Sequence, residues 1–263
     1  CIICVGMTSE ISLIVDTMFA SYLPAGSISL LKYATRFMGI PLGMFASAVS
    51  TITLPYFSRV SSYAPKRLSL FIVEAAKLIF WVTIPVALIM GFFSEKIFHT
   101  IFLSSKFSMS QVLEARTILI AYLVGLFSLS LNKIFLNIYY SRNVVWLPAI
   151  ISVFGVVVNV VFNMILVTYY KAMGLALATS ISAIVQMILL AFFLYVWFGY
   201  TFYMKNFARF MWRYCLQLAC VLPVAFVIYR GVSSLLCTLP AKLSHFLIYG
   251  MGFWLGAGPL CLA

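Results

Sequence analysis

The chain has 263 residues, of which 65% are hydrophobic and only 8% are charged. Soluble domains carry about 25% charged residues, so this composition excludes an ordinary soluble protein and indicates a membrane protein. The apolar runs are about 20 residues long and do not alternate with polar positions, whereas the strands of a membrane barrel are short and alternate. We therefore predict an all-α fold, a polytopic transmembrane helical bundle.

The apolar runs predict about eight spans. Each run is long enough to cross a hydrocarbon core of about 30 Å. The connections are mostly short, so neighbouring spans should pack antiparallel. The chain begins and ends inside an apolar run, which suggests a fragment of a longer protein. The predicted spans cover residues 1–22, 28–55, 69–93, 115–140, 145–169, 172–198, 208–230 and 241–263.

The net charge of +12 arises from 17 Lys and Arg residues against 5 Asp and Glu residues. These cations are scattered over loops and span ends, so we do not expect a nucleic-acid partner. They either set the membrane topology or bind the anionic head groups of membrane lipids. The more basic connections, 56–68, 141–144 and 199–207, are expected on the cytoplasmic side.

The second predicted span carries an arginine, Arg36, with Lys32 one turn earlier on the same face. A charge facing lipid is costly, so an arginine inside a span marks a functional site by default. A guanidinium group suits phosphate because it forms forked hydrogen bonds. This pattern predicts an anion-binding site at Arg36. The alternative is an ion pair with Asp16 or Glu10 that fixes helix packing.

A predicted helix break follows Arg36 in the same span. Gly39 and Gly43 are four residues apart, and Pro41 lies between them. The glycines permit a close approach between helices, and the proline removes a backbone donor and bends its helix. We expect the helix to open at this point.

A second group of polar residues lies on the fifth predicted span. Gly155, Asn159 and Asn163 recur every four residues and share one helix face. Asp16 in the first span and Thr179 in the sixth add a carboxylate and a hydroxyl. Together with a nearby backbone carbonyl, such oxygens suit a small hard cation, in practice Na⁺. The alternative is ordinary hydrogen bonding between helices.

The remaining polar residues are less specific. Lys133, flanked by Asn132 and Asn137, either lines the same site as Arg36 or extends towards the membrane surface. Glu74 and Lys77 are three residues apart and predict an ion pair on one helix. The chain has no G-x-S-x-G, H-E-x-x-H or P-loop motif, so we expect neither an enzyme nor a cofactor other than a coupling ion.

Three stretches resemble a known family. Residues 25–55 read A-G-S-I-S-L-L-K-Y-A-T-R-F-M-G-I-P-L-G-M-F-A-S-A-V-S-T-I-T-L-P, residues 120–127 read I-A-Y-L-V-G-L-F, and residues 173–182 read M-G-L-A-L-A-T-S-I-S. They are similar to segments of the lipid II flippase family MurJ, also called MviN. This family belongs to the multidrug/oligosaccharidyl-lipid/polysaccharide exporter superfamily. The resemblance runs over about residues 8–198.

The resemblance implies two six-helix lobes around a central cavity, followed by two C-terminal helices that form a groove for a lipid tail. On that basis, residues 1–198 form the second transporter lobe, and residues 199–263 form the two additional helices. The first lobe is missing from this sequence. We expect it to be a partner of this chain.

The resemblance also implies roles for the candidate site residues. Arg36, with Lys32, is expected to hold the pyrophosphate of a lipid-linked precursor. Many family members have Asp before this arginine, where this chain has Thr35, so the site is more positive here. The family's sodium site corresponds to the side chains of Asp16, Asn159, Asn163 and Thr179 and the carbonyl of Leu175.

Asn163 stands where some members have an acid, so we expect weaker Na⁺ binding. The implied function is translocation of lipid-linked peptidoglycan precursor across the bacterial plasma membrane by alternating access, for cell wall biosynthesis. Three alternatives remain: an O-antigen or exopolysaccharide lipid flippase, a drug/cation antiporter of the same superfamily, and a membrane scaffold without transport activity. An antiporter of cationic drugs would favour acidic residues, which are few here.

Overall fold

The computed structural model describes residues 2–24, 26–63, 65–102, 109–198 and 206–220. The chain divides into two compact units, Cys1–Tyr203 and Met204–Ala263. In the second unit the described residues, 206–220, are helical. The predicted span 241–263 and the end of the span 208–230 lie outside the described residues. The lipid-tail groove therefore stays a prediction.

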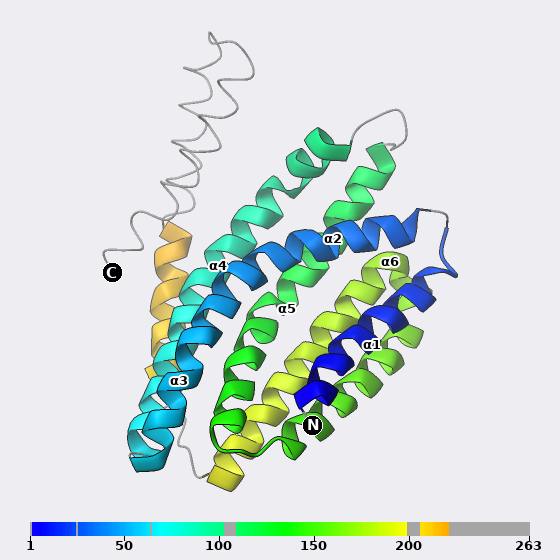
Figure 1. The fold of residues 1–263 in the computed structure, drawn as a ribbon. Helices are drawn as coiled ribbons and strands as arrows, with labels where there is room; N and C mark the ends of the chain where they lie inside the picture. The colour runs from blue at the N-terminus through cyan, green and yellow to red at the C-terminus, as the bar shows by residue number, and fades with distance from the viewer. Residues whose placement is uncertain (1, 25, 64, 103–108, 199–205, 221–263) are drawn as a thin grey trace. The chain divides into compact units, whose positions relative to one another are not determined.

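The described part of the first unit is helical and contains no strand, which confirms the all-α prediction. Four stretches are long and apolar enough to cross a membrane, Ser27–Arg59, Leu68–His99, Met109–Ser141 and Trp146–Phe198, so this is a multi-pass membrane protein. The elements, shown in Figure 1, are α1 (Ile2–Ala20), α2 (Ser27–Pro41), the π-helix η1 (Leu42–Ala46), α3 (Ser47–Tyr63), α4 (Pro65–Phe102), α5 (Met109–Ser141) and α6 (Trp146–Phe198).

The second predicted span consists of three elements. α2 ends at Pro41, η1 follows at once, and α3 continues to Tyr63. In η1 the backbone N–H of Ser47 donates to the carbonyl of Leu42, five residues earlier. Pro41 has no N–H to give to the helix, and its ring disturbs the preceding turn. Such π-bulges are frequent at functional sites, and this one lies one to two turns after Arg36.

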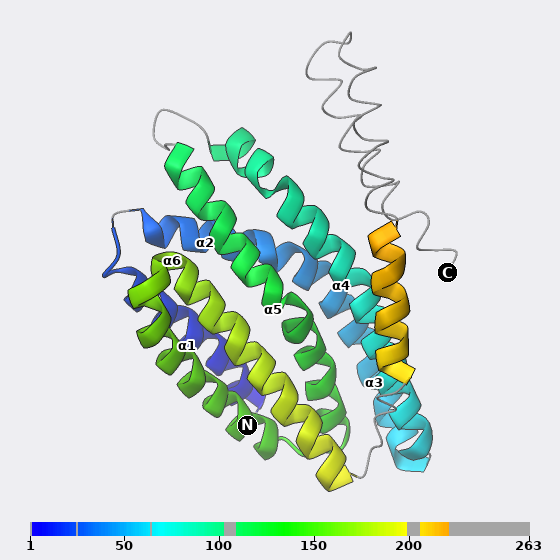
Figure 2. The same ribbon diagram turned by 180° about the vertical axis from the view of Figure 1, so that it is seen from behind.

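α6 is a helical hairpin rather than one straight helix. A straight helix of 53 residues would be about 80 Å long, far more than a bilayer. The backbone reverses at Lys171, which has φ 51° and ψ −131°. The two antiparallel arms, residues 146–170 and 172–198, correspond to the predicted fifth and sixth spans, and Figures 1 and 2 show them side by side.

Aromatic residues lie at both ends of this hairpin. Trp146 and Trp197 pack edge to face at the open end, with ring centroids 5.0 Å apart. Tyr169 and Tyr170 are exposed at the closed end. Arms of this length measure about 38–40 Å, close to the thickness of a bilayer with its head groups, and Trp and Tyr are enriched at membrane–water interfaces. The hairpin is therefore built to span the membrane.

α5 is the central helix of the first unit. It packs against α2, α3, α4 and α6, whereas α1 packs mainly on α6 (Figures 1 and 2). A buried apolar cluster joins α1, α2, α4, α5 and α6. Its members include Leu30, Ala34, Met38, Phe98, Leu119, Tyr122, Leu126 and Leu175.

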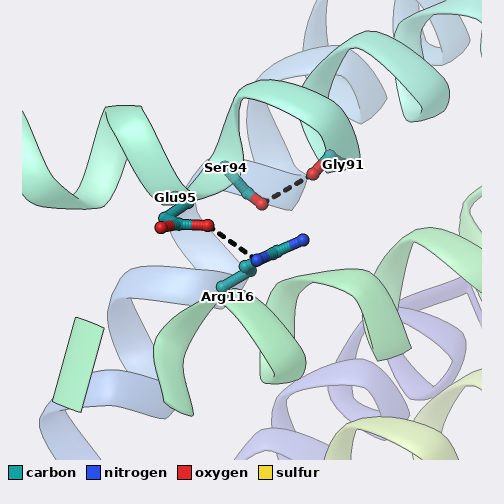
Figure 3. Close-up of polar contacts among 4 residues, drawn as sticks. All are labelled: Gly91, Ser94, Glu95 and Arg116. Atoms are coloured by element: carbon teal, nitrogen blue, oxygen red, sulfur yellow. Dashed lines mark hydrogen bonds and ion pairs between the residues drawn. The ribbon is translucent and has the colours of Figure 1, made fainter. Parts of the chain in front are cut away.

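α4 and α5 are longer than the predicted spans 69–93 and 115–140. Apolar runs locate the membrane-embedded part, but backbone hydrogen bonds continue each helix through its polar ends. There, Arg116 donates to Glu95 at 2.7 Å and ties α5 to α4, and Ser94 donates to the carbonyl of Gly91 (Figure 3). The predicted pair within α4 is confirmed: the Lys77 ammonium lies 2.6 Å from the Glu74 carboxylate.

Candidate functional site

Asp16 of α1 is buried, with 1% of its surface exposed. Its Oδ1 accepts a hydrogen bond of 2.7 Å from Asn163 Nδ2, and its Oδ2 accepts one of 2.9 Å from Thr179 Oγ1. The two partners lie on opposite arms of α6. The carboxylate therefore joins the first helix of the unit to both arms of the last.

Asn159 and Leu175 complete this group. Asn163 Nδ2 also donates to Asn159 Oδ1 at 3.0 Å, and Thr179 Oγ1 also donates to the Leu175 carbonyl at 3.0 Å. Asn159 Nδ2 lies 3.4 Å from Thr179 Oγ1. The structure thus brings together all five residues that the resemblance assigns to a cation site. We call Asp16, Asn159, Asn163, Leu175 and Thr179 the Asp16 cluster.

Close helix packing holds this cluster in place. A Cβ on Gly125 of α5 would lie 2.7 Å from Ser180 Oγ and 2.8 Å from its Cα, so only glycine permits this approach. Ser180 Oγ also donates to the Ala121 carbonyl at 2.7 Å. Because Ser180 follows Thr179 directly, this crossing of α5 and α6 fixes the position of the Thr179 hydroxyl.

The Asp16 cluster has one formal charge and several hard oxygen donors. The partners of the Asp16 carboxylate within the described residues are neutral amide and hydroxyl groups. Asn163 Oδ1 is buried and has no hydrogen-bond partner among them. Buried polar atoms are normally paired, so this orphaned oxygen calls for an explanation. Interhelical hydrogen bonding explains the other contacts but leaves this atom unsatisfied, and a carboxamide oxygen is a ligand type that small hard cations use.

The ligand types also limit which ion fits. Across the part of the chain that the structure describes, no three or more His, Cys, Asp and Glu side chains gather as a metal site. Carboxylate, carboxamide, hydroxyl and carbonyl oxygens suit hard cations, whereas transition metals favour imidazole and thiolate. With a single carboxylate, the Asp16 cluster matches a monovalent cation such as Na⁺ best.

Arg36 and Lys32 lie apart from this cluster, on the exposed side of α2. The opposite side of α2 is buried through Leu30, Ala34 and Met38. Among the described residues, ion pairs join Lys77 to Glu74 and Arg116 to Glu95, and none joins Arg36 to Asp16 or Glu10.

The glycines of the predicted break lie on the same open side of α2 and η1. A Cβ added at Gly39 or at Gly43 would meet no atom within 4 Å. The close helix approach expected from these glycines therefore has no partner within the described residues. Gly39 and Gly43 leave an open surface beside Arg36, and Pro41 places the π-helix next to it.

A third polar group joins α5 to α3. Lys133 Nζ donates to Ser47 Oγ at 2.9 Å, and Asn137 Nδ2 donates to the Ser50 hydroxyl and carbonyl at 2.7 Å each. Lys133 and Asn137 were identified from the sequence, but their serine partners were not. These serines could have been recognised from the sequence, since Ser47 and Ser50 are polar residues three positions apart in an apolar span.

Neighbouring residues serve packing. Asn132 Nδ2 donates to the Ala183 carbonyl at 3.1 Å and approaches Gln186 Oε1 at 3.4 Å. Gln186 Nε2 donates to Ser152 Oγ at 3.0 Å across the two arms of α6. These contacts hold α5 and both arms of α6 together.

Tyr122 of α5 was not identified from the sequence. It is 1% exposed, and its hydroxyl oxygen is buried without a hydrogen-bond partner among the described residues. A tyrosine within an apolar run carries no signal of such a position. Only the packing of α5 between α2 and α6 reveals it.

Several curated relatives are similar to the chain. A protein of Vibrio cholerae named "Probable lipid II flippase MurJ" is 34% identical over 183 residues, which is 69% of this chain and 35% of that protein. Proteins of the same name from Haemophilus influenzae and Thermotoga maritima are 32% and 31% identical, over 69% of this chain and 37% and 38% of their own lengths. The chain thus spans about a third of the curated relatives it matches.

Solved structures show the same fold. A lipid II flippase MurJ in an inward closed conformation superposes with a TM-score of 0.69 and 26% identity, covering 98% of this chain and 53% of that one. An outward-facing multidrug resistance MATE transporter superposes with a TM-score of 0.60 at 16% identity, covering 98% of this chain and 61% of that one, which shows the fold alone. A sequence model described as "Lipid II flippase MurJ" matches residues 2–249, and the chain therefore belongs to the lipid II flippase MurJ family.

Proposed function

We propose that this protein translocates lipid II, the lipid-linked peptidoglycan precursor, from the inner to the outer leaflet of the bacterial plasma membrane. It acts by alternating access, together with a first lobe that this sequence does not contain. The observation that carries the proposal is the pair of cations, Lys32 and Arg36, on the open side of α2 within a membrane-spanning helix. The names of the relatives and the family match support the choice of substrate.

The chemistry of the pair fits a pyrophosphate. The Arg36 guanidinium offers a planar fork of donors that matches two phosphate oxygens, and Lys32 adds a compact positive charge one turn away. The π-helix after Pro41 is a place where α2 can bend relative to α3. A drug/cation antiporter would instead need acidic groups on this side of the helix.

We further propose that the Asp16 cluster holds the coupling ion, Na⁺. Asp16 would balance the charge of the ion, and the oxygens of Asn159, Asn163, Thr179 and Leu175 would complete its shell. In the present arrangement Asn163 directs its nitrogen to Asp16, so rotation of the carboxamide would present the orphaned oxygen instead. Bound Na⁺ supplies a charge that the membrane potential can act on, about 2.3 kcal/mol per 100 mV.

The test uses the intact protein in bacteria depleted of their own lipid II flippase. Arg36→Ala should fail to restore growth at normal membrane abundance, and Arg36→Lys should restore it only partly because lysine lacks the fork. Arg116→Ala is the matched control, because this arginine lies at a helix end in an exposed pair with Glu95. Full growth with Arg36→Ala would overturn the proposal and favour the scaffold alternative. A protein that fails to restore growth of flippase-depleted cells, but restores O-antigen or exopolysaccharide export in strains that lack it, would act on a related lipid-linked substrate.

A further inference from the structure

Lys133 is a cation within a membrane-spanning helix whose charge no acid of this chain balances. It lies about 12 Å from the middle of α5 and about as far from its end at Ser141. All five acids of the chain belong to the described residues, and none forms an ion pair with Lys133. A charge at this depth is unfavourable without a counter-charge, so the position calls for an anion.

The Lys133 side chain reaches across to α3 and does not extend along α5 to the membrane surface. Its Nζ donates to Ser47 Oγ at 2.9 Å. One turn nearer the end of α5, Asn137 donates to the hydroxyl and the carbonyl of Ser50. Ser47 and Ser50 are also one turn apart, so Lys133 meets α3 at its own level. Asn137 thus ties the two helices together, and the ammonium stays inside the span.

The hydrogen bond to Ser47 leaves the ammonium able to bind a ligand. An ammonium has three N–H donors, and one of them is used by Ser47. Within the described residues Lys133 has no further hydrogen bond, and its side chain is half-buried. Two donors and the whole charge therefore remain for an anion, while Ser47 fixes the position of the group.

The open side of α2 that carries Arg36 continues to Lys133. Positions that recur every three or four residues along α2, η1 and α3 hold only cations, glycines and serines, each exposed or half-buried: Lys32, Arg36, Gly39, Gly43, Ser47 and Ser50. Arg36 and Ser47 are 11 positions apart, which is about 16 Å along a helix. One side of this bent helix thus connects two cationic positions.

The two cationic positions lie at different depths in the membrane. The helix formed by α2, η1 and α3 runs parallel to α5, because Ser47 meets Lys133 and Ser50 meets Asn137 (Figures 1 and 2). Both helices lead to the basic connections 56–68 and 141–144, which are expected on the cytoplasmic side. Lys133 is then the inner of the two cations and Arg36 the outer.

We propose that Lys133, positioned by Ser47, is a second binding site for the pyrophosphate of the lipid-linked substrate, on the cytoplasmic side of Arg36. A pyrophosphate that moves outward meets Lys133 first and Arg36 about 16 Å further on. This separation is larger than a pyrophosphate, so the two sites bind it in turn. The inference rests on the proposed function, because it extends the path of the same substrate.

The test counts the pyrophosphate groups bound by the intact protein, including its first lobe, in detergent. The probe is farnesyl pyrophosphate, whose tail is too short to select one site, and equilibrium dialysis at saturation gives the number bound. Lys133→Gln and Arg36→Gln should each lower this number by one, and the double variant should lower it by two. Lys133→Arg keeps the charge and should bind as many as the wild type.

Three further variants separate binding from packing. Ser47→Ala should keep the number bound but weaken the inner site by about threefold to tenfold, because the ammonium loses the group that positions it. Asn137→Ala should lower the unfolding temperature without changing the number bound. Arg116→Gln removes a cation from an exposed ion pair on the same helix and should leave the number bound unchanged.

Each contrary result has its own meaning. If Lys133→Gln binds as many as the wild type while Arg36→Gln loses one, the inner site is refuted and the proposed function stands. If both single variants and the double variant lose the same one molecule, the two residues form one site. Displacement of the probe from the inner site by equal amounts of phosphatidylglycerol would make it a site for phospholipid head groups. An unchanged number in Arg36→Gln would refute the proposed substrate site, and the inference with it.

Discussion

Asn163 donates a hydrogen bond of 2.7 Å to the carboxylate of Asp16, although 147 residues separate the two in the chain. This contact places a buried charge at the point where α1 meets both arms of α6. An isolated buried carboxylate is unfavourable unless it is hydrogen-bonded and balanced. The bonds to Asn163 and Thr179 supply the first condition, and a bound cation would supply the second.

Asp16→Asn should abolish the response of the protein to Na⁺. The substitution keeps the shape of the side chain but removes the only acid of the Asp16 cluster. At a hundred times its dissociation constant, a ligand stabilises the folded state by about 2.7 kcal/mol, and the variant should lose this gain. Unfolding in NaCl and in choline chloride measures it. A variant that responds to Na⁺ as the wild type does would show that the ion binds elsewhere.

Asn163→Asp should strengthen Na⁺ binding. A second carboxylate adds attraction for the cation, and every 1.4 kcal/mol gained is a tenfold decrease in the dissociation constant. Without Na⁺ the two neighbouring acids repel each other, so the variant should be less stable in choline than the wild type. A sodium titration of the unfolding temperature tests both effects. Weaker binding by this variant would contradict the proposed ligand role of Asn163.

Gly125→Ala should destabilise the fold by about 1–3 kcal/mol, because its Cβ would collide with Ser180. Since Ser180 adjoins Thr179, the same variant should also weaken the response to Na⁺. Gly91→Ala is the control, because its Cβ would only touch Leu123 at 3.8 Å. That control should be neutral or gain about 0.5–1 kcal/mol from reduced chain flexibility. Equal stability of the two variants would refute the close crossing of α5 and α6.

Glu95→Gln should change stability by less than about 1 kcal/mol. Glu95 and Arg116, the pair drawn in Figure 3, have side chains that are 42% and 40% exposed. Water and salt screen such exposed ion pairs. The free energy of unfolding of wild type and variant should converge further at high salt. A large, salt-independent loss would mean that this pair does more than tie α4 to α5.

The spacing of residues explains which parts of the Asp16 cluster could be predicted. Asn159 and Asn163 lie four apart in one apolar helix, so their shared face follows from helix geometry. Asp16 was grouped with them because its carboxylate complements their oxygens as cation ligands, but only the structure shows the contact, because no local pattern links residues 147 positions apart. Tyr122 was missed for the same reason, since its environment depends on three helices at once.

Helix boundaries show the limits of apolar runs as predictors. The fifth and sixth predicted spans match the two arms of α6, because the polar turn around Lys171 interrupts the apolar run there. The second span carries a predicted break at Gly39, Pro41 and Gly43, and η1 divides it directly after Pro41, since the proline forces a change in backbone hydrogen bonding. α4 and α5 are longer than the predicted spans 69–93 and 115–140, because backbone hydrogen bonds, unlike hydropathy, continue through charged residues.

The sequence by itself determined that this protein is a helical membrane protein with few charges inside its spans. Composition and run length decide this, because only helices satisfy their own backbone groups within lipid. The tertiary structure alone decided which polar groups meet. It buried Asp16 among neutral partners, left Arg36 on an open side of α2, and joined Lys133 of α5 to Ser47 of α3. Such contacts depend on how helices cross, which small residues such as Gly125 permit and no local sequence pattern encodes.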